Sequence, residues 1–261
     1  MLKDWTHLGI HALITLQQAV LYRSATLLGV YKEADLPLQA ADMCNIGKMA
    51  DILPWNSLRD VMTPINLNNS LIFAGALEVD LQRKLVTDLR NLAREAPFRQ
   101  YETRSGRKIG VRMTAAGDYG WISDRAGYRY ETTQPDGSSW PNIPRSLIEI
   151  WQRFAGCLRD PQCCLVNYYG ANTRMGLHQD KDEADLSLPV LSISLGDDAL
   201  FRVGGTIRSD STKSIWLKSG DVCLLTGSSR MAFHGIDKLR LGSSKLLANG
   251  GRINVTMRVV D

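Results

Sequence analysis

A series of short alternating segments fills the chain from Cys163 onward and limits the folds that it can adopt. The segments span 163–169, 190–195, 199–203, 214–217, 222–225, 231–236 and 252–260, with Gly, Asp, Asn or Ser in the gaps between them. Successive side chains of a strand point to opposite faces of a sheet, so two-residue alternation predicts strands. Closely spaced short strands predict an α+β fold, namely a β-sandwich or jelly roll with helices packed on one sheet.

Two helices are predicted ahead of these strands. Residues 80–95 carry leucines at helical spacing with charged residues between them, and Pro97 ends the pattern. A second helix is predicted over 145–158, because Pro144 suits the start of a helix and apolar residues then recur on one face. Residues 1–55 are predicted to form an N-terminal appendage of unassigned role, and 56–261 to form the main domain.

Composition narrows the class of protein further. The net charge of +4 is compatible with a polyanionic partner and equally with an ordinary soluble domain. The five cysteines contain no C-x-x-C pair, which argues against a disulfide framework and a thiolate zinc site and favours a reducing compartment. There is no run of about 18 apolar residues that could span a membrane. We therefore expect a cytoplasmic monomer without a membrane segment.

The last predicted strand has one polar and one apolar face. From Arg252 to Val259 the even positions are Arg, Asn, Thr and Arg, and the odd positions are Ile, Val, Met and Val. Taken alone, this pattern favours a surface strand with its polar side in water. Two guanidinium groups and an amide on one face could instead line a pocket for a dicarboxylate.

His178, Asp180 and His234 could bind a metal ion together. Residues two apart in an extended segment share a face, so His178 and Asp180 can reach one ion. His234 follows 54 residues after Asp180, and His178 and His234 are the two of the four histidines that lie outside the appendage. Two histidines and one carboxylate form the facial triad of non-haem iron(II) oxygenases, although H-x-D alone occurs by chance in many chains.

Three motifs together resemble the AlkB family of nucleic-acid dealkylases. They are L-H-Q-D-K-D-E at 177–183, F-H-G at 233–235 and R-x-N-x-T-x-R at 252–258, and the resemblance extends from about 70 to 261. It implies a double-stranded β-helix, the jelly roll, as a core over 161–261, with a nucleotide-recognition region over about 110–160. Leu225 stands where the family pattern has Trp, and we expect this change to lie in the core.

The resemblance also implies roles for individual residues. His178, Asp180 and His234 would ligate Fe(II), with O2 and 2-oxoglutarate as co-substrates. The distal carboxylate of 2-oxoglutarate would pair with Arg252, helped by Asn167 and Tyr169, and its other end would meet Asn254 and Arg258. The residues that would contact substrate are Met113, Trp121, Tyr128, Tyr130, Asp182, Glu183 and Arg208.

The implied reaction is oxidative repair of N-alkylated bases, of the 1-methyladenine and 3-methylcytosine type, in single- or double-stranded DNA. It would release succinate, CO2 and formaldehyde. Aromatic side chains would hold a base taken out of its stack, and a carboxylate such as Asp182 suits a cationic lesion. The alternatives are an RNA demethylase, a hydroxylase of another substrate with the same cofactors, and a non-catalytic nucleic-acid-binding module.

Overall fold

Two antiparallel sheets form most of the chain from residue 62 to 261, which is the part that the computed structural model describes. The appendage predicted at 1–55 lies outside the described residues, and its boundary stays a prediction. The larger sheet has the order β1 (Ile65–Leu67), β2 (Ser70–Phe73), β11 (Val222–Leu225), β8 (Val190–Gly196), β13 (Arg252–Arg258), β6 (Cys163–Tyr169) and β3 (Arg112–Gly117). The smaller sheet has the order β10 (Lys213–Leu217), β9 (Asp198–Val203), β12 (His234–Arg240) and β7 (Met175–His178).

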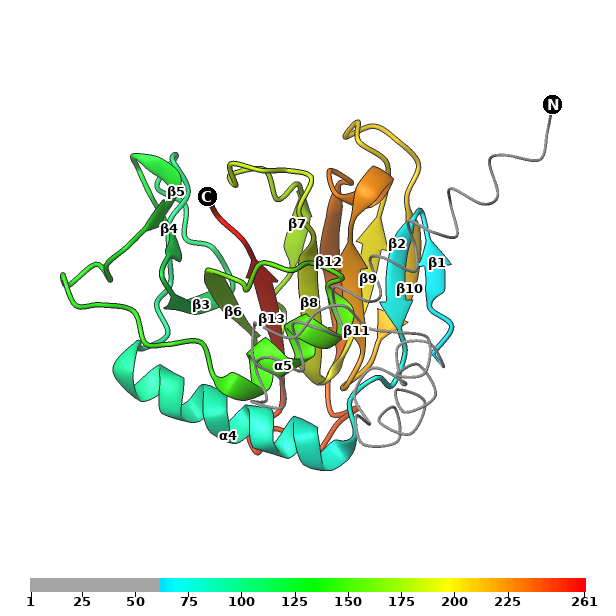
Figure 1. Cartoon of the computed structure of the whole chain (residues 1–261), viewed down its shortest axis with the longest axis horizontal. Coiled ribbons are helices and arrows are strands. Elements are labelled where there is room, and N and C mark those ends of the chain that lie inside the picture. The colour runs from blue at the N-terminus through cyan, green and yellow to red at the C-terminus, as the bar shows by residue number, and fades with distance from the viewer. Residues whose placement is uncertain (1–61) are drawn as a thin grey trace, which may run out of the picture. The chain divides into compact units, whose positions relative to one another are not determined.

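The chain alternates between these sheets in the manner of a jelly roll (Figure 1). From β6 to β13 the strands belong in turn to the larger, smaller, larger, smaller, smaller, larger, smaller and larger sheet. The predicted jelly roll is therefore confirmed, and the larger sheet extends beyond residues 161–261 to include β1, β2 and β3. A separate two-stranded sheet joins β4 (Gly120–Asp124) to β5 (Gly127–Glu131).

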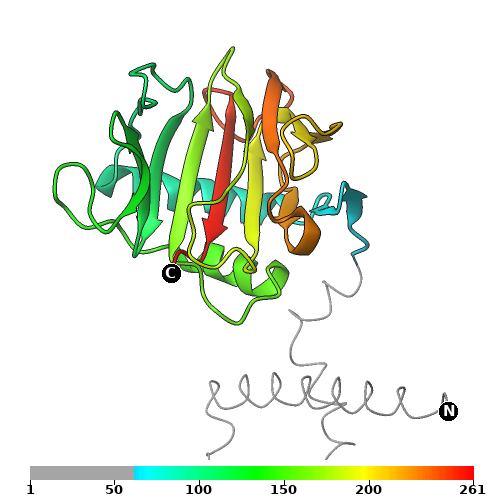
Figure 2. The same cartoon turned by 90° about the horizontal axis from the view of Figure 1, so that it is seen from above.

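Two helices lie against the larger sheet, α4 (Val79–Glu95) and α5 (Arg145–Phe154) (Figure 2). The apolar spacing predicted for α4 is confirmed, since Leu85 and Leu89 are buried. The second helix was predicted to continue to residue 158, which is wrong. It ends at Phe154 because Gly156 adopts a positive φ of 64°, which stops a helix readily.

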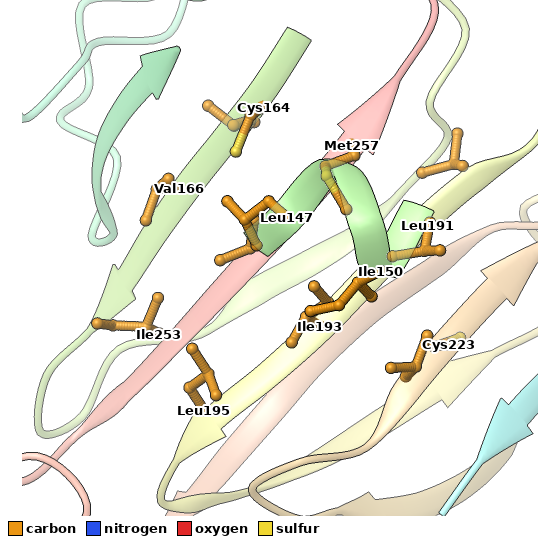
Figure 3. Close-up of a cluster of buried hydrophobic side chains, with 14 of the residues drawn as sticks. Leu147, Ile150, Cys164, Val166, Leu191, Ile193, Leu195, Cys223, Ile253 and Met257 are labelled. Atoms are coloured by element: carbon orange, nitrogen blue, oxygen red, sulfur yellow. The ribbon is translucent and has the colours of Figure 1, made fainter. Parts of the chain in front are cut away.

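The main apolar core lies between α5 and the larger sheet (Figure 3). Leu147 and Ile150 of α5 lie over Ile193 of β8 and Met257 of β13, and all four side chains are buried. Full burial of one such aliphatic side chain contributes roughly 1.5–3 kcal/mol to the free energy of unfolding. Every residue of β13 is buried, so the interpretation of this strand as a surface strand is wrong. Its apolar face packs toward the helices, and its polar face points between the sheets.

Within residues 62–261, no helix is both long and apolar enough to cross a membrane. The four cysteines in this part of the chain are free thiols, and three of them are buried.

Candidate active site

A cavity of about 950 Å³ opens between the two sheets, beside the β4–β5 hairpin. Its lining includes most of the side chains that the sequence predicted for the site: His178, Asp180, His234, Asn167, Tyr169, Arg252, Asn254, Arg258, Met113, Trp121, Tyr128, Asp182 and Arg208. Two predicted residues, Tyr130 and Glu183, do not line it. Leu225 is buried in the core as expected, and it also lines this cavity.

The two histidines and the aspartate meet at one point of the cavity wall. His178 ends β7, His234 begins β12, and these residues are directly opposite each other in the smaller sheet. Asp180 Oδ1 lies 3.9 Å from His178 Nε2, and Asp180 Oδ2 lies 3.8 Å from His234 Nε2. Ligand atoms of all three lie within 4.8 Å of one another, a spacing that suits coordination of one metal ion.

Gly235 allows β12 to approach β7 closely enough for this arrangement. A Cβ atom at Gly235 would lie 2.6 Å from Met175 O, which is closer than real Cβ contacts. The register of the two strands also shifts between His234 and Ile236, where β7 contains one residue more than β12. The glycine after His234 is thus required by the backbone geometry that brings the two imidazoles together.

Backbone carbonyl groups orient both imidazoles. His178 Nδ1 lies 3.0 Å from Gly176 O, and His234 Nδ1 lies 2.9 Å from Ala232 O. A carbonyl oxygen can only accept a hydrogen bond, so both Nδ1 atoms carry the proton and donate. The Nε2 lone pairs are therefore free, and they face Asp180 as metal ligands would.

The charges of the triad also suit a metal ion. Burial opposes ionisation of Asp180, but the Arg258 guanidinium and the two imidazoles outweigh it and hold the pKa of this carboxyl well below its usual range. Burial, helped by His178, lowers the pKa of His234 to about 4. Near neutral pH the site therefore presents an ionised carboxylate and a neutral imidazole, which are the ligand forms that metals bind.

Arg252 fits the carboxylate of a co-substrate. Its side chain is 1% exposed and donates one hydrogen bond, from Nη2 to Ser194 Oγ at 2.9 Å. Its Nε and Nη1 are buried without a partner, and its guanidinium lies 5.3 Å from the Tyr169 ring centroid. A buried cation with free donors facing a cavity needs an anionic partner, and a carboxylate matches the guanidinium fork.

Asn167 and Asn254 continue this polar face. Asn167 Nδ2 donates to Asn254 Oδ1 at 3.5 Å, and Asn167 Oδ1 is buried without a partner. Asn254 Nδ2 donates to Ser192 Oγ at 2.5 Å, so the neighbouring strand β8 fixes its amide. With Nε and Nη1 of Arg252, the Asn167 oxygen is the third unsatisfied polar atom in this wall. Together these groups fit the co-substrate role predicted for β6 and β13.

Arg258 is directed toward protein groups. Its Nη2 lies 3.0 Å from Asp180 Oδ2, and its Nη1 donates to Tyr130 Oη at 3.0 Å. Its Nε lies 3.3 Å from Glu183 Oε1. Arg258 thus forms an ion pair with the carboxylate of Asp180. Its predicted contact with 2-oxoglutarate stays a prediction.

Glu183 and Tyr130 do not line the cavity and instead bond to residues behind its wall, and their predicted contact with substrate stays a prediction. The Glu183 side chain is 1% exposed and forms an ion pair with Arg230 at 2.9 Å. Tyr130 donates to Glu183 Oε1 at 2.5 Å, and burial raises the pKa of its hydroxyl so that it stays protonated. Arg230 was not predicted. Its one sequence signal is that no other residue between Asp221 and Asp237 carries a fixed charge.

The β4–β5 hairpin carries the aromatic side chains at the mouth of the cavity. Trp121 and Tyr128 stack with ring centroids 5.4 Å apart and an interplanar angle of 16°. Trp121 Nε1 donates to Asp182 Oδ2 at 3.4 Å, which links the hairpin to the segment after Asp180. Arg208 lies over the Phe233 ring at 5.6 Å, and Met113 is buried in the wall.

Comparisons with known proteins agree with this geometry. Residues 70–258 match the family described as the 2OG-Fe(II) oxygenase superfamily. The chain is 50% identical over 188 residues to an alpha-ketoglutarate-dependent dioxygenase AlkB homolog of Caulobacter vibrioides, covering 72% of this chain and 86% of the relative. It is 39% identical over 180 residues to alpha-ketoglutarate-dependent dioxygenase AlkB of Escherichia coli, covering 67% of this chain and 83% of the relative.

More distant relatives have names that state their substrates. A DNA N(6)-methyladenine demethylase of Arabidopsis thaliana is 32% identical, covering 72% of this chain and 48% of the relative. A tRNA demethylase of Schizosaccharomyces pombe is 32% identical, covering 46% of this chain and 41% of the relative. The solved structure of OsALKBH1 superposes with a TM-score of 0.63 at 29% identity, covering 76% of this chain and 99% of that one. The chain belongs to the AlkB family of Fe(II)- and 2-oxoglutarate-dependent dioxygenases.

Proposed function

We propose that this dioxygenase removes alkyl groups from N-alkylated bases in nucleic acid, with alkylated DNA of the 1-methyladenine and 3-methylcytosine type as its substrate. The proposal rests on the side chains that surround the His178–Asp180–His234 triad. A stacked aromatic pair and exposed cations surround the mouth of the cavity in which the metal ligands lie. A flexible polyanion with aromatic bases matches both features.

The protein's contribution is to hold and orient the reactants. When bound, Fe(II), O2 and 2-oxoglutarate together supply the oxidising power that hydroxylates a C–H bond of the alkyl group. His178, Asp180 and His234 would hold the metal, and Arg252 would fix the co-substrate through its two free donor atoms. Hydroxylation of an N-methyl carbon gives an N-hydroxymethyl group, which releases formaldehyde and leaves the unmodified base.

Exposed cations at the cavity mouth support a phosphate-containing partner. Besides the buried Arg252, five basic lining residues form no ion pair with any residue in the 62–261 range: Arg107, Lys108, Arg174, Lys181 and Arg208. All five are exposed. Lysine and arginine that neutralise phosphates supply most of the sequence-independent affinity for nucleic acid. A hydroxylase of a small neutral substrate would have no use for such a rim.

Trp121, Tyr128 and Asp182 support a base as the group that enters the cavity. Aromatic faces hold an unstacked base with about 1–3 kcal/mol of binding free energy each. The Asp182 carboxylate lies beside Trp121, where it can pair with the positive charge that methylation places on adenine N1 or cytosine N3. An enzyme that acts on a base must take it from a single strand or flip it out of a duplex.

RNA is the second candidate substrate. It is favoured by the relative named as a tRNA demethylase. The cationic rim recognises phosphates, which DNA and RNA share, and only contacts with the 2′-hydroxyl distinguish the two. A direct comparison of DNA and RNA oligonucleotides therefore decides between them.

The test is anaerobic loading of the protein with Fe(II) and 2-oxoglutarate, followed by addition of O2 and single-stranded oligonucleotides. The oligonucleotides carry 1-methyladenine, 3-methylcytosine or 1,N6-ethenoadenine in matched DNA and RNA sequences. We expect repaired base and succinate in equal amounts with DNA, and formaldehyde with the methylated bases. The variants His178→Ala and Asp180→Ala should give none of these products while remaining folded. Repair of RNA alone would replace the DNA assignment, and 2-oxoglutarate turnover without repair of any oligonucleotide would refute the nucleic-acid proposal.

A further inference from the structure

We propose that Arg230 and Glu183 are positioning residues that set the metal affinity of the triad, although neither lines the cavity. Arg230 lies four residues before His234, and its side chain is 3% exposed. Its guanidinium donates to three acceptors on the segment that carries Asp180. Nη1 donates to Asp180 O at 2.6 Å, Nε to Leu188 O at 2.7 Å and Nη2 to Glu183 Oε2 at 2.9 Å.

Glu183 connects Arg230 to the second guanidinium at the site. Its Oε2 accepts from Arg230, and its Oε1 lies 3.3 Å from Arg258 Nε. Arg258 in turn donates from Nη2 to Asp180 Oδ2 at 3.0 Å. The contacts form a closed ring of two carboxylates and two guanidinium groups. Asp180 belongs to this ring twice, through its backbone carbonyl on Arg230 and through its side chain on Arg258.

The ring fixes a metal ligand that otherwise has little support. Asp180 lies just after β7, and most residues from Lys181 to Ser187 are exposed. Arg230 ties this segment to the chain immediately before β12, on which His234 lies. The distance between the aspartate and the histidine therefore depends on a side chain that touches neither the metal position nor the co-substrate wall.

The charges of the ring balance, and this makes each member necessary. Two largely buried anions are paired with two buried cations, so removal of one leaves an uncompensated charge inside the protein. A neutral Gln in place of Glu183 would leave both guanidinium groups without their second anion. Both would then attract the Asp180 carboxylate more strongly, and this carboxylate would bind a metal ion less tightly. Loss of a group that orients a metal ligand typically weakens metal affinity by about 10- to 100-fold.

The test measures Co(II) binding to the metal-free protein, which does not depend on the proposed nucleic-acid substrate. Affinity comes from titration, and the ligand geometry comes from the visible absorption bands of bound Co(II). We expect Glu183→Gln to weaken Co(II) binding by about 10- to 100-fold and to alter these bands. Arg230→Lys keeps the charge but cannot reach three acceptors, so it should give a smaller loss.

A double variant separates positioning from simple support of the fold. Glu183→Gln with Arg230→Gln restores the charge balance, so its melting temperature should recover relative to Glu183→Gln alone, while its Co(II) affinity should stay low. The matched control is Asp198→Asn, which removes the ion pair with Arg240 at 3.1 Å elsewhere on β9 and β12. We expect it to lower stability and to leave Co(II) affinity unchanged.

Wild-type Co(II) affinity and absorption in both Arg230→Lys and Glu183→Gln would overturn the proposal. Recovery of metal affinity together with stability in the double variant would also overturn it, because the ring would then act only on the fold. If Glu183→Gln does not fold, Arg230→Lys and the double variant still decide the question.

Discussion

At the scale of single residues, Arg252 carries the clearest requirement for a ligand. Burial lowers the pKa of its guanidinium, because a charge held away from water is disfavoured. Ser194 satisfies one nitrogen atom, and two others remain without a partner. The protein thus maintains an unfavourable group in its interior, and a bound carboxylate would compensate this cost.

Replacement of Arg252 by Met should separate binding from stability. Charge-assisted hydrogen bonds contribute about 1.5–3 kcal/mol, so we expect the dissociation constant for 2-oxoglutarate to rise roughly 10- to 150-fold. The ligand-free variant should melt at the same temperature as the wild type or higher, because an unpaired buried charge is gone. The measurement is the rise in melting temperature on adding 2-oxoglutarate with Mn(II). The exposed Arg90 on α4 gives a control, Arg90→Met, and an undiminished rise in Arg252→Met would contradict the assignment.

The buried ion pair of Arg230 could not be predicted from the sequence alone. An isolated charge in an apolar stretch indicates a buried ion pair, but its partner Glu183 lies 47 residues away. No local spacing connects the two, so only the folded chain identifies the pair. By contrast, His178, Asp180 and His234 were predicted to lie together although His234 is 54 residues from Asp180, because the resemblance to family motifs groups them.

At the scale of elements, the pairing of β7 with β12 determines whether the two imidazoles meet. Gly235 and Gly176 lie on these two strands, yet only Gly235 is in close contact. A Cβ there would lie 2.6 Å from a backbone oxygen, whereas a Cβ at Gly176 would meet nothing within 4 Å. The two glycines therefore form a natural pair for comparison.

We expect Gly235→Ala to lower the free energy of unfolding by about 1–3 kcal/mol, because the added methyl group forces the strands apart. It should also weaken metal binding, since His234 would shift with its strand. Gly176→Ala should change the free energy of unfolding by less than about 1 kcal/mol. Urea denaturation and Co(II) titration measure the two effects, and equal behaviour of the two variants would show that strand separation does not limit the site.

The β4–β5 hairpin is the element that presents Trp121. We expect Trp121→Ala to weaken binding of a methylated single-stranded oligonucleotide by about 1–3 kcal/mol, through loss of base stacking. Turnover of 2-oxoglutarate in the absence of oligonucleotide should be unaffected, because the metal and co-substrate residues lie on other strands. Trp216 on β10 does not line the cavity, so Trp216→Ala is the control. Normal repair of methylated oligonucleotides by Trp121→Ala would contradict the stacking role.

The sequence predicted strands well where alternation was regular and poorly elsewhere. The predicted bounds of β6 and β11 agree with the structure, since both strands are bounded by turn residues. β7 was not predicted, because Met175–His178 is short, contains Gly176 and does not alternate. The strand predicted over 231–236 lies at His234–Arg240 as β12, because a 3-10 helix at Gly227–Ser229 and the turn and irregular residues after it occupy the chain up to Phe233. Which side of β13 faces the cavity could not follow from alternation, because both of its faces are buried.

At the scale of the whole described chain, the two sheets of the jelly roll carry different groups of the candidate active site. The smaller sheet carries the two histidines, and the larger sheet carries Arg252 and both asparagines. Helices cover the larger sheet on its other face, so polar strand residues there can only point into the cavity. The exposed cations then gather where the cavity opens.

This distribution of charge predicts a salt dependence of nucleic-acid binding. Each phosphate contact to a single strand contributes about −0.7 to the slope of log affinity against log salt. We therefore expect Arg107→Gln and Lys108→Gln each to reduce the magnitude of the slope by about 0.7, with little preference among sequences. Arg90→Gln on α4 should leave the slope unchanged. Fluorescence anisotropy at several salt concentrations measures it, and unchanged slopes in both rim variants would place the phosphate path elsewhere.

In the part of the chain from residue 62 onward, β4 and β5 pair with each other and with no strand of the larger or the smaller sheet. The aromatic residues of the proposed base-binding site therefore lie on a ribbon apart from the strands that carry the two histidines, and Tyr130 connects this ribbon to Glu183 and Arg258. Exchange of this ribbon for one of different length or composition would change the proposed base preference of the same oxidation chemistry, provided that Tyr130 is retained. A lineage could in this way acquire new nucleotide targets while keeping one inherited reaction.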